Sequence, residues 1–136
     1  MTLYNKPLPV RDRDSLPFWD AARQRQLVVQ KCSTCGTFRW PPGPICFRCQ
    51  SIAVEWMPSS GRGHVYSWIV VHQALAGFED EVPYAVVVVD LDDAPGVRLY
   101  GHLVGCKPEN IYGNMPVSAF FEDATSEITL VKFRPA

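Results

Sequence analysis

Four of the five cysteines stand in two C-x2-C pairs, Cys32/Cys35 and Cys46/Cys49, with ten residues between the pairs. A tight turn at each pair can direct both thiolates at one ion, and two pairs supply the four sulfurs of a tetrahedral zinc site. Gly36 directly follows the first pair, at a position where the backbone often needs a positive φ. The spacing predicts one Zn²⁺ ion bound by all four cysteines, with iron on the same sulfurs as the alternative.

The predicted metal centre is structural. Four thiolates fill a tetrahedral coordination sphere, so no position remains for water or substrate, and such a site stabilises a small module without activating a nucleophile. The first residues, MTLYNKPLPVRDRD, contain no apolar signal-peptide core, and the chain has no run of apolar residues long enough to span a membrane. We therefore expect a cytoplasmic protein without a membrane span, in which the cysteines stay reduced and bind metal.

Charge is distributed unevenly along the chain. The total is balanced, with 13 Lys and Arg against 14 Asp and Glu, which is not typical of a nucleic-acid-binding protein. Residues 1–50 nevertheless carry eight basic and three acidic side chains, a net charge of +5. Residues 51–136 carry five basic and eleven acidic side chains, a net charge of −6. The two parts are expected to attract each other or to face different partners.

The first two parts of the chain are small. Residues 1–26 are predicted to form an extended arm and a short helix over Ser15–Gln26, with Ser15 as the N-cap and Pro17 in the first turn. Residues 27–58 form the cysteine module, which we expect to be a zinc ribbon. Its flanking strands are predicted at Leu27–Lys31 and Ile52–Met57.

Residues 59–136 show an all-β pattern. Short apolar runs alternate with turn residues such as Asp92-Asp93-Ala94-Pro95-Gly96. Five strands in a segment of this length favour a small closed barrel, as in an OB-fold, with an open sandwich as the alternative. The fold is therefore predicted to be mainly β. The expected strands are His64–His72, Tyr84–Leu91, Val97–Val104, Val117–Glu122 and Ile128–Phe133.

Alternation along two of these strands separates an aliphatic face from an aromatic and basic face. If the alternation is regular, Val65, Ser67, Ile69 and Val71 face the barrel interior, together with Val97, Leu99, Gly101 and Leu103. The opposite, outer face then carries Tyr66, Trp68, Arg98, Tyr100 and His102. These side chains either form a ligand surface or pack against the ribbon and the helix. The insert at 73–83 is expected to expose Leu75 and Phe78.

The sequence contains no convincing catalytic constellation. No G-x-S-x-G, P-loop or H-E-x-x-H motif is present. Cys106 and His102 would lie about 13 Å apart on one extended strand, which is too far for activation of a thiol unless Gly105 turns the chain. We predict no catalytic residues in this chain.

Several motifs occur in a fixed order and together resemble the DUF-thirty-five family, a rubredoxin-like zinc ribbon followed by an OB-fold. The resemblance covers about residues 15–134. The motifs are Phe18-Trp19-Asp20-Ala21-Ala22, Cys32-x2-Cys35-Gly36, Trp40-Pro41-Pro42, Cys46-x2-Cys49, Ser60-Gly61-Arg62-Gly63 with Val65-Tyr66-Ser67, Gly77-Phe78, Pro83-Tyr84, Leu103-Val104-Gly105-Cys106 and Met115-Pro116-Val117. One departure is Gln50, which follows the second cysteine pair where the family often has glycine.

The resemblance implies an accessory subunit that binds acyl-CoA and supports a thiolase-like enzyme in making or breaking carbon–carbon bonds of CoA thioesters. It also implies that the two cysteine pairs are the metal ligands. A CoA site needs cations for phosphate and a flat apolar surface for adenine. Candidates for the first are Arg62, Arg98 and Lys107, and for the second Tyr66, Trp68 and Phe78.

Two other functions remain open from the residues alone. Zinc ribbons and OB-folds both occur in single-stranded nucleic-acid-binding proteins, and Tyr66, Trp68 and Tyr100 could stack on bases. Iron in the four-cysteine site would instead indicate electron transfer.

Overall fold

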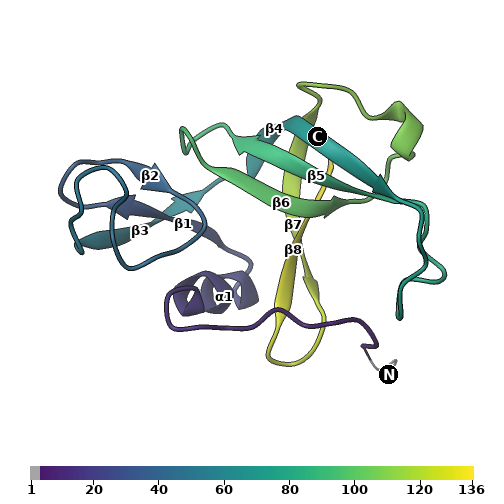
Figure 1. Cartoon of the computed structure of the whole chain (residues 1–136), viewed down its shortest axis with the longest axis horizontal. Coiled ribbons are helices and arrows are strands. Elements are labelled where there is room, and N and C mark those ends of the chain that lie inside the picture. Colours follow the sequence, from purple (N-terminus) through teal and green to yellow (C-terminus); the bar gives the residue numbers. More distant parts are fainter. Residues whose placement is uncertain (1–3) are drawn as a thin grey trace.

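The computed structural model describes residues 4–136 and has two sheets joined by a continuous chain (Figure 1). The first sheet is the ribbon, with strand order β2-β1-β3 and antiparallel pairing. The second is a closed barrel with strand order β4-β5-β6-β8-β7. In residues 4–136, one α-helix of eight residues and one 3-10 turn complete the fold. No helix among these residues has the length and apolar character that a membrane span requires. The predicted combination of short helix, ribbon and five-stranded OB-fold barrel is confirmed.

The elements lie close to their predicted positions. The helix is shorter at its C-terminal end than predicted, and the two-residue strand β2 and the 3-10 turn η1 were not predicted. The bounds are α1 Leu16–Arg23, β1 Leu27–Cys32, β2 Phe38–Arg39, β3 Val54–Ser59, β4 Arg62–Val71, β5 Tyr84–Leu91, β6 Arg98–Leu103, η1 Pro108–Asn110, β7 Pro116–Asp123 and β8 Thr129–Pro135.

Local signals explain both ends of α1. The Asp12 carboxylate accepts a hydrogen bond from the Ser15 backbone N–H at 2.8 Å, and Pro17 lies in the first turn, where its missing N–H costs nothing. The helix ends before Arg25, which has a φ of 61°. Phe18 and Ala22, one turn apart, are the buried residues of the helix. This face joins the helix to the rest of the core.

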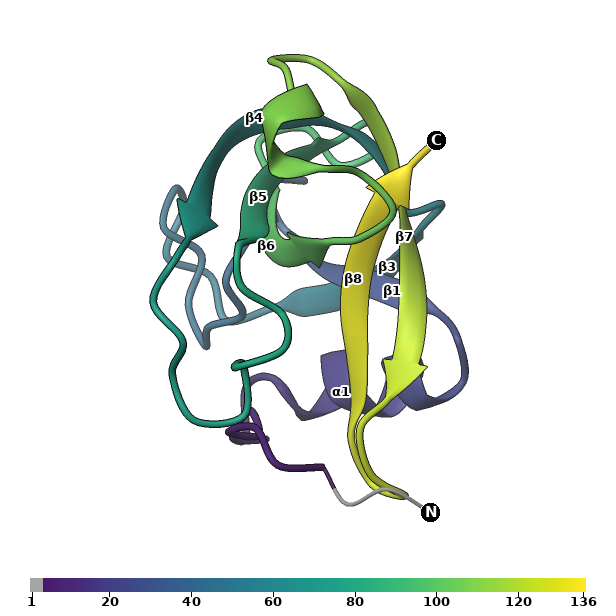
Figure 2. The ribbon, with the colours of Figure 1, turned by 90° about the vertical axis from the view of Figure 1, so that its right-hand side faces the viewer.

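The five barrel strands enclose their own interior (Figure 2). β5 is paired on both sides, with β4 and with β6. Closure is made by β7 pairing with β4, and by a short parallel contact between Leu103 of β6 and Phe133 of β8. Because the five strands pair into a closed barrel, the alternative of an open sandwich is excluded. Closure also leaves fewer unpaired strand edges than an open sheet would have.

A β-bulge at Tyr66 reverses the faces of β4. Val65 pairs with Val89 and Ser67 pairs with Val88, which makes Tyr66 an extra residue in the strand. Val65 is fully buried, whereas Ile69 is 62% exposed and Trp68 packs against the core. The prediction that Ile69 faces inward and Trp68 outward is therefore wrong, because one inserted residue moves every following side chain to the opposite face.

Strand β6 follows the predicted alternation. Leu99 and Leu103 are buried, and Arg98 and Tyr100 are exposed. Gly101 of this strand lies against the Phe133 ring, and a Cβ at position 101 would lie 2.7 Å from a ring carbon. The missing side chain makes room for the largest side chain of the barrel interior.

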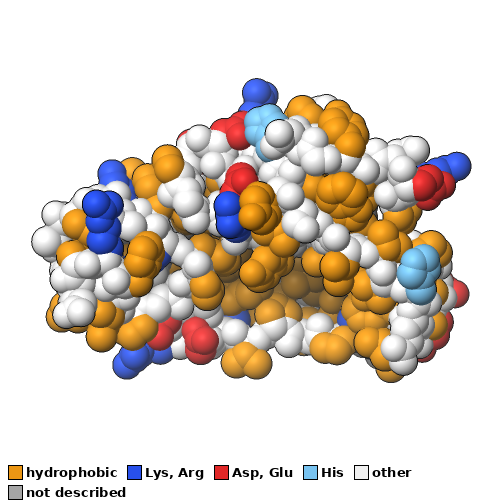
Figure 3. All heavy atoms as spheres, turned by 45° about the horizontal axis from the view of Figure 1, so that its top comes forward, with side chains coloured by type: hydrophobic (Ala, Val, Ile, Leu, Met, Phe, Trp, Pro, Cys, Tyr) orange, Lys and Arg blue, Asp and Glu red, His pale blue; other side chains and the backbone are white. Residues whose placement is uncertain are grey.

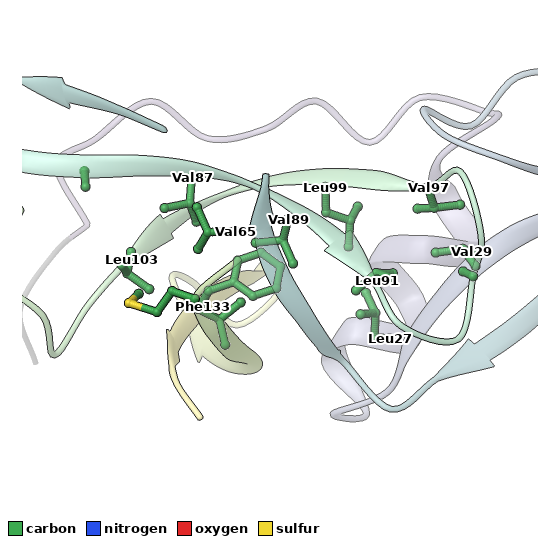
Figure 4. Packing of buried hydrophobic residues seen from close by; sticks show 14 of the residues in the cluster. Leu27, Val29, Val65, Val87, Val89, Leu91, Val97, Leu99, Leu103 and Phe133 are labelled. Atoms are coloured by element: carbon green, nitrogen blue, oxygen red, sulfur yellow. The ribbon is translucent and has the colours of Figure 1, made fainter. Parts of the chain in front are cut away.

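One hydrophobic core runs through both sheets. Phe18 of α1 and Leu27 and Val29 of β1 belong to the same buried cluster as the barrel residues. Figure 4 shows Leu27 and Val29 beside Leu91 and Val97 at one end of the barrel, with Phe133 deeper inside. The ribbon is therefore anchored to the barrel through β1.

Residues 4–14 of the N-terminal arm lie along the barrel, and basic side chains before the ribbon pair with acids after it. Figure 2 shows the arm next to the 72–83 loop. Lys6 Nζ lies 2.7 Å from Glu81, Arg11 lies 3.5 Å from Glu127, and Arg25, beyond the helix, lies 2.7 Å from Asp123. Each pair joins the basic first part of the chain to the acidic second part, as is expected if the two parts attract each other.

Asp123 should make stability depend on pH. Arg25 donates two hydrogen bonds to its carboxylate, at 2.8 and 2.7 Å, and Thr129 donates a third. These bonds hold the pKa of Asp123 well below its usual range. A depressed folded-state pKa adds stability above the unfolded-state pKa of about 3.9, and this stability is lost as the pH falls below that value.

We expect Asp123→Asn to lower the urea midpoint modestly at pH 7 and to flatten its fall between about pH 5 and pH 2. The measurement is a set of urea unfolding curves across that range. Asp80→Asn, in the exposed loop after β4, is the control and should follow the wild-type profile. A profile for Asp123→Asn as steep as that of the wild type would contradict the assignment.

Candidate functional site

The two C-x2-C segments form two knuckles with the same backbone hydrogen bonds. In the first, Cys32 N–H donates to Thr37 C=O and Gly36 N–H donates to Cys32 C=O, both at 2.9 Å. In the second, Cys46 N–H donates to Ser51 C=O and Gln50 N–H donates to Cys46 C=O, again at 2.9 Å. The second knuckle therefore repeats the first at a distance of fourteen residues along the chain.

Both knuckles require a positive φ after the second cysteine. Gly36 has a φ of 76° and Gln50 a φ of 63°. Glycine takes this conformation without steric cost, whereas a side chain such as that of Gln50 is disfavoured there. Gln50 nevertheless adopts this φ and makes the equivalent hydrogen bond, so the departure from glycine at position 50 leaves the knuckle geometry unchanged.

The four cysteine sulfurs converge. The Sγ atoms of Cys32 and Cys49 are 3.5 Å apart, those of Cys35 and Cys46 are 3.7 Å apart, and all four lie within 4.8 Å of one another. A tetrahedral site with Zn–S bonds near 2.3 Å has S···S edges of about 3.8 Å, so the sulfurs are spaced for one ion. Cys32 and Cys46 are fully buried, and Cys35 and Cys49 are exposed.

The polypeptide around the sulfurs favours thiolates. Backbone N–H groups of Cys49 and Arg48 lower the pKa of Cys46 to about 6, and those of Cys35 and Thr34 lower the pKa of Cys32. At Cys49 the Ser51 N–H acts in the same direction, but the other three sulfurs oppose it, and the pKa is raised to about 12. Four negative charges cannot share so small a space without a cation, and a bound divalent ion removes this repulsion.

The segment between the knuckles is fixed by a buried polar cluster. The Gln30 side-chain oxygen accepts hydrogen bonds from Arg39 Nε at 2.8 Å and from Gly43 N–H at 3.0 Å. Arg39 also donates to Gly43 C=O at 3.1 Å. Gln30 and Arg39 are among the few buried polar side chains, and they hold the Trp40–Pro44 turn against β1.

The six predicted ligand-binding residues have different surroundings in the structure. Arg98 lies over the Tyr66 ring at 3.7 Å and also pairs with Asp90 at 2.9 Å. Trp68 packs against the core, and Phe78 is half-buried and stacked on Tyr84 at 5.3 Å.

The remaining two candidates lie elsewhere. Arg62 lines a cavity of about 420 Å³ with His64 and Asp92, and Lys107 precedes η1. Within residues 4–136, Tyr66 and Arg98 are the only two of the six whose side chains make a ring or charge contact with each other.

Sequence reasoning missed an apolar groove between the helix, the ribbon and the barrel. Its volume is about 270 Å³. Figure 3 shows a hollow with hydrophobic walls in this part of the molecule. The density of aromatic residues in the helix and after the first knuckle was the available signal, but only the fold shows that they line a common space. The lining residues are Pro9, Phe18, Trp19, Trp40, Leu99, Tyr100, Leu130, Val131 and Phe133.

Cys106 and His102 line one shallow cavity of about 220 Å³ together with Glu81 and Tyr84. Gly105, with a φ of 77°, turns the chain between them. The Cys106 thiol donates to Lys107 C=O at 3.4 Å, and the His102 ring packs on Tyr84 at 4.5 Å. Burial lowers the pKa of His102, which favours its neutral form.

The fold and the metal centre define the class of protein: a four-cysteine zinc ribbon, with one structural zinc ion, joined to an OB-fold barrel. Residues 19–55 match the family model described as the ChsH2 rubredoxin-like zinc ribbon domain, and residues 56–122 match the ChsH2 C-terminal OB-fold domain. The chain belongs to the DUF35 family, since it is 36% identical over 114 residues to a DUF35 domain-containing scaffold protein of Methanocaldococcus jannaschii. That match covers 82% of this chain and 79% of the relative.

Two further relatives are named for enzymes. A probable enoyl-CoA hydratase alpha subunit of Thermomonospora curvata is 42% identical over 132 residues, which is 96% of this chain but only 40% of that protein. A solved structure described as "Ltp2-ChsH2(DUF35) aldolase" has a chain that superposes with a TM-score of 0.83 at 40% identity. This match covers 94% of the present chain and 98% of that chain.

Proposed function

We propose that this chain is an accessory subunit that docks on a thiolase-like enzyme acting on CoA thioesters and helps to hold the acyl substrate. The observation that carries the proposal is the match, over almost the full length of both chains, with the DUF35 chain of an aldolase structure. A match of this extent supports a role for the whole chain, ribbon and barrel together. The closed four-cysteine site fits this role, because it supplies rigidity and leaves the chemistry to the partner.

The apolar groove supports the acyl-binding part of the proposal. Its lining includes no charged side chain, so it suits a hydrocarbon and not a phosphate or a carboxylate. Tyr100, which lines the groove, is 72% exposed. An acyl chain in the groove would leave the polar part of a CoA thioester at the surface.

A nucleic-acid-binding function has less support. Such a surface needs free cations beside stacking aromatic rings. Arg98 lies over Tyr66, but its charge is already paired with Asp90. Trp68, the third predicted stacking residue, packs against the core.

The experiment is co-expression of the full chain with a thiolase-like enzyme of CoA thioesters from the same organism. We expect the two proteins to elute as one complex and the enzyme to need this chain for activity. In that complex, Tyr100→Arg should weaken turnover of long-chain acyl-CoA more than that of acetyl-CoA, whereas Tyr112→Arg, also at an exposed tyrosine, should change neither. Separate elution with full activity of the enzyme alone would overturn the proposal.

A further inference from the structure

The two knuckles have the same backbone hydrogen bonds but carry different side chains on their surfaces. Their equal spacing and hydrogen bonds pair Ser33 with Phe47, Lys31 with Ile45, and Phe38 with Ile52. Each pair occupies the same place relative to the metal ligands. The first knuckle therefore shows which side chains this backbone needs, and the second can be compared with it position by position.

The second knuckle exposes apolar side chains at positions where the first knuckle has a polar or a half-buried side chain. Ser33 is a small polar residue, and Phe38 is half-buried with Lys31 Nζ 5.4 Å from its ring centre. In the second knuckle, Ile45 is 54%, Phe47 74% and Ile52 77% exposed. In the first knuckle, Ser33 occupies the position equivalent to Phe47, and that knuckle makes the same backbone hydrogen bonds. The metal site therefore does not require a phenylalanine at position 47. Three exposed large apolar side chains within eight residues indicate a contact made outside this chain.

The charges around these side chains indicate what they contact. Arg48 is exposed, is the only charged residue between Ile45 and Val54, and has no ion pair among residues 4–136. Of the three basic residues of the ribbon, residues 27–58, Arg39 is buried, whereas Lys31 and Arg48 reach the surface, and the ribbon has one acid, Glu55. At the ribbon end of the molecule, Figure 3 shows hydrophobic side chains beside Lys and Arg. An apolar centre with a basic margin complements an apolar pocket with an acidic margin.

We propose that the second knuckle, with Phe47 at its centre and Ile45, Ile52 and Arg48 around it, inserts into an apolar pocket bordered by carboxylates on a partner protein. The inference deepens the proposed function and rests on it, since the partner is then the enzyme that this chain assists. Phe47 acts as the anchor that a pocket desolvates, and Arg48 pairs with a carboxylate at the margin. The zinc ion fixes the backbone that presents both residues.

Other occupants fit the surface less well. Three apolar side chains and one cation bury too little area for stable anchoring in a lipid bilayer, which takes a longer apolar face or an acyl chain with a basic cluster. A second copy of this chain would have to offer an apolar pocket with acids. Its apolar groove includes no carboxylate in its lining, and the cavity of about 420 Å³ is lined by Arg62 and His64 as well as Asp92. The acid of the 220 Å³ cavity, Glu81, is already paired with Lys6.

The first measurement identifies what touches position 47. In the test variant, the full chain carries a photo-crosslinking phenylalanine analogue at position 47. In the control variant, the analogue is at position 69, a matched exposed site on the barrel. Each variant is produced and irradiated in the organism from which the chain comes. We expect one protein adduct that is specific to position 47, identified by mass spectrometry as an enzyme of CoA thioesters. No adduct, a lipid adduct or only a dimer of this chain would overturn the inference.

The second measurement tests affinity with the purified trapped protein. Phe47→Ser places in the second knuckle the residue that the first knuckle has, so the fold and one bound zinc per chain should be kept. We expect its dissociation constant to rise about tenfold or more, equivalent to about 1.4 kcal/mol. Ile69→Ser should leave the constant unchanged, and Arg48→Glu should raise it most at low salt.

The two proposals fail in different ways. If the wild-type complex forms and Phe47→Ser binds as tightly as wild type, the knuckle is not the docking surface and the accessory function stands. If the protein trapped at position 47 binds through Phe47 but acts on no CoA thioester, the docking surface stands and the proposed function is wrong.

Discussion

Replacing Cys46 with serine is expected to abolish stoichiometric zinc binding and to unfold the ribbon. Cys46 is fully buried, and its sulfur lies 3.7 Å from that of Cys35. Structural zinc sites contribute about 10 kcal/mol or more of apparent binding energy, which in so small a module is folding energy. We expect the metal content to fall from one zinc per chain to nearly none and the Tm to fall by roughly 10 °C or more.

The loss should extend beyond the ribbon. Leu27 and Val29 of β1 belong to the core cluster shared with the barrel, so an unfolded ribbon removes part of the barrel's own packing. Cys106→Ser is the matched control, because Cys106 lies outside the metal centre and should keep both zinc and Tm. A chelator should reproduce the effect of Cys46→Ser on the wild type. A Cys46→Ser protein that melts at the wild-type temperature would contradict a structural role for the metal.

The same measurement separates zinc from iron. Both metals suit four cysteine sulfurs, and the sequence left iron open. A colourless protein with one zinc per chain is expected, and visible absorption from bound iron would instead support electron transfer.

Local features of the fold and site were predictable from the sequence. The metal ligands lie within two short turns, so spacing alone brings each pair together, and their meeting requires only one hairpin. Strands β5 and β6 alternate without interruption, and Leu99 and Leu103 face the interior as predicted. Where structure depends on short stretches of chain, residue pattern is sufficient.

Features that depend on distant segments were not predictable. The bulge at Tyr66 has no local marker, because it reflects the fit of β4 against β5. That single residue exchanged the predicted positions of Trp68 and Ile69. Phe78 was expected at an exposed loop, but it stacks on Tyr84, and the arm residue Lys6 lies 5.5 Å from its ring centre. The apolar groove likewise needs residues from the arm, helix, ribbon and barrel at once.

The close approach of Gly101 and Phe133 gives the second large expected effect. Phe133 is completely buried in the barrel interior, and a Cβ on Gly101 would lie 2.7 and 2.8 Å from two of its ring carbons. Phe133→Ala should lower the free energy of unfolding by about 3–5 kcal/mol, through lost burial and an internal cavity. Because domains of this size are stable by only about 5–15 kcal/mol, this variant should be close to unfolded at 37 °C. Urea unfolding at 25 °C measures the loss.

A double-mutant cycle tests whether the ring itself causes the requirement for glycine. Gly101→Ala alone should destabilise the protein by about 1–3 kcal/mol, because its methyl group overlaps a buried aromatic ring that cannot move freely. In the Phe133→Leu background the two ring carbons are gone, so the same methyl group should cost less or even fill space. The two substitutions should therefore couple by about 1 kcal/mol or more. Additive effects would mean that Gly101 is required by the backbone of β6 and not by its contact with Phe133.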